Sequence, residues 1–145
     1  MLVVRSACAT FCRTLSLLLS SGITLTDSLE MVANNMSNIY FKEAVQRVRT
    51  QVVEGWQLHT ALEVTGLFPP LVYNLVSIGE ETGDLQDMLS KTADYYDEEV
   101  ENATQSLLSM MEPAVILLMG VFVVIIVLSI YLPMLNMTKM YDSYL

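Results

Sequence analysis

Residues 114–132 read AVILLMGVFVVIIVLSIYL, a run of nineteen residues without a charged side chain. As an α-helix, at about 1.5 Å per residue, the run would be about 28 Å long, close to the ~30 Å hydrocarbon core of a bilayer. A chain of 145 residues can scarcely surround a helix that is apolar on every side. We therefore expect this stretch to cross a membrane.

The residues that flank this run predict where the membrane helix begins and ends. Glu112-Pro113 suits a helix start, because proline fits the first turn and an acid there faces the positive end of the helix dipole. Pro133 is expected to stop the helix. These limits predict three segments: a helical bundle domain at 1–111, a transmembrane helix at 112–133 and a short C-terminal tail at 134–145.

The upstream residues repeat apolar side chains at three- and four-residue steps, which is the spacing of one helical face. Glycines separate the repeats, and Thr24 with Asp27 can cap a helix start. Later helices are predicted over residues 39–53, around Leu58, Ala61 and Leu62, and through Leu71, Leu75 and Ile78. From Leu85 the helical spacing continues into the membrane run. The fold class is therefore all-α: a small antiparallel bundle of about six helices followed by one transmembrane helix.

Composition excludes several classes of function. Seven Lys and Arg against sixteen Asp and Glu give a net charge of −9, which repels the phosphate backbone of nucleic acids. Cys8 and Cys12 are too few and too close in sequence to staple a secreted fold, so we expect a reducing compartment and two buried thiols.

Motifs that carry catalysis are absent: there is no phosphate-binding glycine loop, no G-x-S-x-G elbow and no H-E-x-x-H pair. The single histidine, His59, has no cysteine or acid at a catalytic spacing and is expected to be a surface or interface residue. We expect a protein that is not an enzyme and needs no cofactor.

An acidic block precedes the membrane run, with ten carboxylates from Glu80 to Glu112 against the single Lys91. It has three open interpretations. The block is a solvated helix face in the first. In the second, Glu80 and Asp84, four residues apart, lie side by side on a helix and form a weak site for a divalent cation such as Ca²⁺. In the third, the block steers a basic partner close to the membrane. The candidate partner-binding residues are Glu80, Glu81, Asp84 and Asp87.

Several short motifs occur in a characteristic order. They are Phe11-Cys12-Arg13-Thr14-Leu15, the stretch from Leu19 to Leu25, Leu67-Phe68-Pro69, the turn Gly79-Glu80-Glu81-Thr82-Gly83-Asp84-Leu85, Glu112-Pro113 and Leu132-Pro133. In this order the chain resembles the type II secretion system protein F family, the inner-membrane platform proteins of type II secretion and type IV pilus assembly. Members of that family look like two copies of a helical domain with three membrane spans. This sequence is similar to the second copy and the final span, which implies a fragment, a truncated reading frame or one part of a split protein.

The resemblance implies a scaffold in the bacterial inner (cytoplasmic) membrane with its helical domain in the cytoplasm. Its expected partners are a hexameric assembly ATPase, prepilin-like subunits, other inner-membrane components of the machine, membrane lipid and further copies of itself. A helix continuous from Leu85 through Leu132 would transmit a push or a rotation. Whether the cargo is a pilus or a secreted enzyme stays open.

The family turn maps to Gly79, Glu80, Thr82 and Gly83. Two roles are weighed for it: partner contact, or a tight turn in which the glycines adopt φ angles that other residues resist and Thr82 caps the last helix.

Charge gives a conflicting indication of topology. The nearest positive charge to the run is Lys139, which by the positive-inside rule would place the C-terminus in the cytoplasm. The resemblance implies the opposite orientation, and we follow it because one lysine is weak support. The alternative function is a single-span sensor or adaptor whose acidic cytoplasmic domain binds an ion or a partner. Its membrane helix would dimerise, yet Gly120 is the only small residue between Val115 and Leu128.

Overall fold

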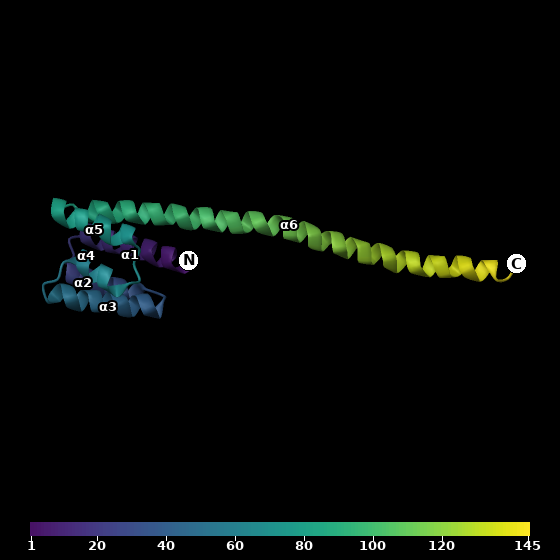
Figure 1. Cartoon of the computed structure of the whole chain (residues 1–145), viewed down its shortest axis with the longest axis horizontal. Coiled ribbons are helices and arrows are strands. Elements are labelled where there is room, and N and C mark those ends of the chain that lie inside the picture. Colours follow the sequence, from purple (N-terminus) through teal and green to yellow (C-terminus); the bar gives the residue numbers. More distant parts are fainter. The chain divides into compact units, whose positions relative to one another are not determined.

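The computed structural model describes all 145 residues, and its regular elements are helices throughout. The six helices are α1 (Leu2–Ser20), α2 (Leu25–Asn35), α3 (Ile39–Val53), α4 (Leu58–Thr65), α5 (Pro70–Thr82) and α6 (Leu85–Asp142) (Figure 1). The chain divides into two units, Met1–Ala103 and Thr104–Leu145. The predicted fold class, an all-α bundle with a long apolar C-terminal helix, is confirmed.

The first unit has one hydrophobic core, built from α1 to α5 and the beginning of α6. Three aromatic rings lie at its centre: Phe68 packs against Phe11 with ring centroids 4.9 Å apart and against Phe41 at 5.6 Å, the second pair edge to face. Such tilted and edge-on pairs are favoured by the ring quadrupoles. Fully buried aliphatic side chains surround the rings: Leu15, Leu29, Val32, Val45, Val48, Leu58, Leu62, Val72, Val76 and Leu89.

Local signals in the sequence explain the ends of the short helices. The Thr24 hydroxyl accepts a hydrogen bond from the Asp27 amide at 3.4 Å, so the predicted cap of α2 is confirmed. The Asn38 side chain does the same for the Tyr40 amide at the start of α3. Gly66, with φ +67°, ends α4 in the left-handed conformation that glycine adopts without steric cost.

The helix predicted through Leu71, Leu75 and Ile78 is present as α5, but other residues form its buried face. Val72, Val76 and Gly79 are buried, whereas Leu71 and Ile78 are exposed. Both sets of residues have the same four-then-three spacing, so periodicity alone could not distinguish them. The outcome depends on Gly79, whose missing side chain lets α6 approach closely.

Two helices, α1 and α6, are long and apolar enough to cross a membrane by length and composition. In α1 the side chains of Cys8, Phe11, Cys12 and Leu15 have no exposed surface, because they lie in the core of the first unit. Helix α1 is therefore a core helix of the bundle.

The second unit consists of the remainder of α6 and the three residues that follow it. Its apolar side chains from Val115 to Leu132 are exposed, and the helix runs through both Pro113 and Pro133 to Asp142. The predictions that a helix begins at Glu112-Pro113 and stops at Pro133 are therefore wrong. Each proline removes one N–H donor and frees one carbonyl, on Ser109 and Ser129 respectively, and the helix-forming residues on both sides continue the helix. The limits of the membrane-spanning segment stay a prediction.

Candidate functional site

The Gly79 to Asp84 segment connects the end of α5 to the start of α6. Gly83 has φ +76° and ends α5 in the left-handed region. Gly79 lies inside the helix, where a Cβ atom would stand 2.8 Å from the Leu85 Cα and 3.2 Å from the Met88 side chain. The prediction that both glycines supply unusual φ angles is thus correct for Gly83 only, and Gly79 instead permits close approach of the two helices.

The Glu80 carboxylate caps a different helix. Its two oxygens accept hydrogen bonds from the backbone amides of Leu58 at 3.1 Å and His59 at 2.8 Å, which begin α4. The residue at the N-cap position, Gln57, makes no side-chain cap of its own. Glu80 therefore satisfies amides that the helix start leaves free, and its charge faces the positive end of the α4 dipole.

His59 completes this contact, because its Nδ1 atom lies 3.0 Å from a Glu80 oxygen. The His59 and Glu80 side chains are 25% and 21% exposed. The sequence shows no acid at a catalytic spacing from His59, and the fold brings Glu80 to it from 21 positions away. The pair joins α4 to α5.

Thr82 does not cap α6, contrary to the prediction. It is the last residue of α5, and its hydroxyl donates to the Ile78 carbonyl oxygen at 2.9 Å. The left-handed Gly83 separates it from α6, which starts two residues later at Leu85.

The same glycine breaks the predicted alignment of Glu80 and Asp84. Glu80 lies in α5, while Asp84 lies beyond Gly83 and outside both helices. The prediction that the two carboxylates stand side by side on one helix face is therefore wrong, and Glu80 is already engaged by backbone amides. No three His, Cys, Asp or Glu side chains come together in an arrangement that could hold a metal ion.

The other candidate partner-binding residues are on the surface. Glu81 and Asp84 are exposed, and Asp87 pairs with Lys91, one turn further along α6, at 2.8 Å. An exposed pair of this kind contributes little to stability. Glu112 and Pro113 are exposed and belong to the second unit.

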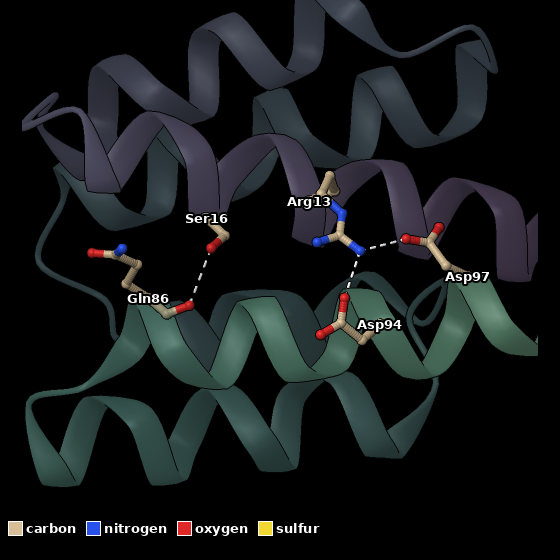
Figure 2. A network of polar contacts seen from close by, with 5 residues as sticks. All are labelled: Arg13, Ser16, Gln86, Asp94 and Asp97. Atoms are coloured by element: carbon tan, nitrogen blue, oxygen red, sulfur yellow. Dashed lines mark hydrogen bonds and ion pairs between the residues drawn. The ribbon is translucent and has the colours of Figure 1, made fainter.

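Three acids of the block on α6 pair with arginines of α1. One terminal nitrogen of Arg13 contacts the Asp94 carboxylate at 2.7 Å and the Asp97 carboxylate at 2.5 Å (Figure 2). Nearer the start of α1, Arg5 pairs with Glu99 at 3.1 Å. Hydrogen bonds to Asp97 and Asp94 raise the pKa of the Arg13 guanidinium.

A third polar contact also joins α1 to α6. The Ser16 hydroxyl donates to the backbone carbonyl oxygen of Gln86 at 3.2 Å, on the same side of α1 as Arg13 (Figure 2). We call the three contacts, Arg5–Glu99, Arg13–Asp94/Asp97 and Ser16–Gln86, the α1–α6 seam. Sequence reasoning missed the seam, because the arginines are more than 80 residues away from their acids.

Apolar and small side chains lie on the inner side of the seam. Cys8 and Cys12 are fully buried and belong to the same cluster as Leu89, Ala93 and Tyr96 of α6. Burial raises the pKa of the Cys8 thiol to about 12. Burial is also the main reason why the pKa of Cys12 is raised, with smaller contributions from Cys8 and Asp97. Both thiols are thus protonated and shielded, and the expectation of two buried cysteines is confirmed.

This chain is similar to known proteins over most of its length. Residues 11–133 match the family described as "Type II secretion system (T2SS), protein F". The chain is 41% identical over 132 residues to the "Type IV pilus assembly protein PilC" of Pseudomonas aeruginosa, an alignment that covers 91% of this chain and 35% of that protein.

Two further relatives are similar to this chain over nearly the same length. Identity is 40% over 131 residues to the "Type IV pilus assembly protein PilC" of Thermus thermophilus, covering 90% of this chain and 32% of the relative. Identity is 36% over 132 residues to the "Type II secretion system protein F" of Vibrio cholerae, covering 91% of this chain and 32% of the relative. The chain thus spans about a third of the length of the curated relatives that it matches. Because the family match covers most of the chain, from Arg13 of the seam through the α5–α6 turn to the apolar part of α6, the chain belongs to the type II secretion system protein F family.

Proposed function

We propose that the chain is the membrane-anchored part of an inner-membrane platform in a bacterial pilus-assembly or type II secretion machine. Its relatives are named as components of both kinds of machine. The observation that carries the proposal is helix α6. Its first residues pack in a folded bundle, and the same helix continues as a charge-free apolar segment.

Membrane anchoring is supported by the chemistry of the second unit. Residues 114–132 carry no charge, and their large side chains are exposed in the isolated chain. Exposed aliphatic surface of this extent is unfavourable in water and favourable in lipid. Tyr131 lies at the end of the run, and Tyr141 and Tyr144 lie beyond it, where amphipathic rings would lie at the membrane–water interface.

The bundle is placed in the cytoplasm in this proposal. Two buried, protonated thiols suit a reducing compartment, and the family resemblance implies the same orientation. Lys139 beyond the apolar run is the single opposing charge.

The proposed role is mechanical rather than catalytic. A cytoplasmic ATPase would do the chemical work and act on the bundle, and α6 would pass the movement to pilin-like subunits in the membrane. A helix transmits displacement along its axis better than a loop, because each backbone hydrogen bond restrains the next turn. Exposed Glu81 and Asp84 are the acidic groups near the α5–α6 turn that are available to a basic surface of the ATPase.

Site-specific photo-crosslinking tests the partner. A crosslinking amino acid at Glu81 or Asp87 should capture a co-expressed assembly ATPase of the same bacterium. The same amino acid at Glu43, an exposed acid on α3, should not. Equal capture from all three positions, or capture from Glu43 alone, would contradict the proposed contact surface.

A further inference from the structure

The α1–α6 seam adds polar contacts to a small apolar contact between the bundle and the base of α6, residues 85–100. Helix α6 contributes only four buried residues to the core: Leu89, Thr92, Ala93 and Tyr96. The central aromatic cluster of Phe11, Phe41 and Phe68 contains no residue of α6. The first five helices therefore keep most of their core if the base of α6 moves away.

Arg13 is the central contact of the seam. Its single guanidinium pairs with both Asp94 and Asp97, which are three residues apart and neighbours on the helix surface. The Arg13 side chain is 40% exposed and the two carboxylates are more exposed still, so water and salt ions reach the cluster. Loss of Arg13 would leave two adjacent carboxylates without their counter-charge.

We propose that the base of α6 is a detachable element that undocks from α1 while helices α1 to α5 stay folded, and that the Arg13 cluster controls how often it undocks. Arg5 and Ser16 support the same contact from either side of Arg13. The seam is thus a latch made of exposed charges placed over a small apolar contact.

Undocking would change how α1 is connected to α6 within the first unit. With the seam closed, a movement of α1 reaches α6 through three side-chain contacts as well as through the chain itself. With the seam open, α6 stays joined to the bundle by the Gly83-Asp84 link and by the close packing of Leu85 and Met88 on Gly79. This consequence rests on the proposed function, whereas undocking itself does not.

Cys12 provides a native reporter of undocking. It is fully buried, and the charge of Asp97 on α6 acts on its thiol. Opening the seam would expose the thiol and return its pKa towards the ordinary value, which makes it reactive. In a Cys8→Ala background, Cys12 is the only thiol of the chain.

The experiment measures the rate at which a thiol reagent modifies Cys12 in the full chain in detergent micelles. We expect slow modification in about 50 mM salt and a several-fold faster rate in about 1 M salt, where charge pairs are screened. Arg13→Gln should raise the low-salt rate by about 5-fold. Arg49→Gln is the matched control, since it removes an exposed arginine paired with Glu30 between α2 and α3 and should leave the rate within about 2-fold.

Two further measurements separate undocking from general unfolding. The double variant Arg5→Gln, Arg13→Gln should lose the salt acceleration, because both cationic contacts of the seam are gone. The modification rate should depend weakly on urea, since undocking exposes far less surface than unfolding does. Asp97→Asn serves as the second single variant should Arg13→Gln fold poorly.

The proposal is overturned if Arg13→Gln and Asp97→Asn accelerate modification no more than Arg49→Gln. It is also overturned if the rate rises with urea as steeply as the loss of helical circular dichroism. Neither result bears on membrane insertion, because the measurement is made in micelles and needs no partner.

Discussion

At the scale of single residues, the acids of the family turn divide into one that holds the fold together and others that face solvent. Glu80 joins α5 to the start of α4 through two backbone amides and His59, although it is more than twenty positions away in sequence. Glu81, its neighbour, is exposed. Adjacent residues of one motif thus have different roles, and substitution can separate them.

Glu80→Ala should lower the free energy of unfolding of the bundle by about 1–2 kcal/mol, because two amides at the start of α4 lose their acceptor. Glu81→Ala is the matched control and should change it by no more than about 0.5 kcal/mol. Thermal unfolding of both variants in detergent, followed by circular dichroism, measures the difference. Equal effects would show that the cap is not what Glu80 contributes.

Gly79 and Gly120 are both helical glycines, but only Gly79 is crowded. We expect Gly79→Ala to destabilise the bundle by about 1–2 kcal/mol, because the new Cβ would force the Leu85 backbone away. Gly120→Ala meets no neighbour and should be neutral or slightly stabilising, since alanine favours helix. The same thermal unfolding measurement compares them, and a neutral Gly79→Ala would contradict the close approach of α5 and α6.

At the scale of elements, the proposed function depends on α6, and Pro113 interrupts the backbone hydrogen bonds of this helix. The proline lacks an N–H group, so the Ser109 carbonyl oxygen has no partner four residues ahead. Hydrogen exchange should still show protection of the amides from Ser109 to Glu112. Pro113→Ala should increase this protection by restoring the missing donor. Rapid exchange throughout this stretch would show a flexible joint and would count against transmission along the helix.

The sequence predicted the short helices well because their signals are local. Thr24 caps α2 within three residues, and Gly66 ends α4 by its own backbone conformation. The interpretation of Pro113 and Pro133 failed because a proline also fits inside a helix whose neighbours favour the helical state.

Contacts between distant segments could not be predicted from local patterns. Glu80 with His59 and Arg13 with Asp94 and Asp97 bring together residues that the sequence separates widely. The spacing of apolar residues along the sequence does not predict which arginine will face which acid. The expected Glu80–Asp84 pair failed for a related reason: one left-handed glycine between them redirected the chain.

At the scale of the whole molecule, the chain combines an acidic helical bundle with an apolar helix, and it spans about a third of the length of its relatives. Orientation is its least constrained property, because Lys139 is the only basic residue after Lys91. A reporter that is active only in the cytoplasm should work when fused before Met1 and fail when fused after Leu145. The reverse pattern would place the bundle on the outer side of the membrane.

The central claim is that the apolar part of α6 anchors the bundle in a membrane. The most direct measurement is the distribution of the full chain after cell lysis and alkaline carbonate washing. The account predicts that the chain stays in the membrane pellet and is released only by detergent. A chain that is released by the wash and behaves as a monomer in detergent-free buffer would contradict the account.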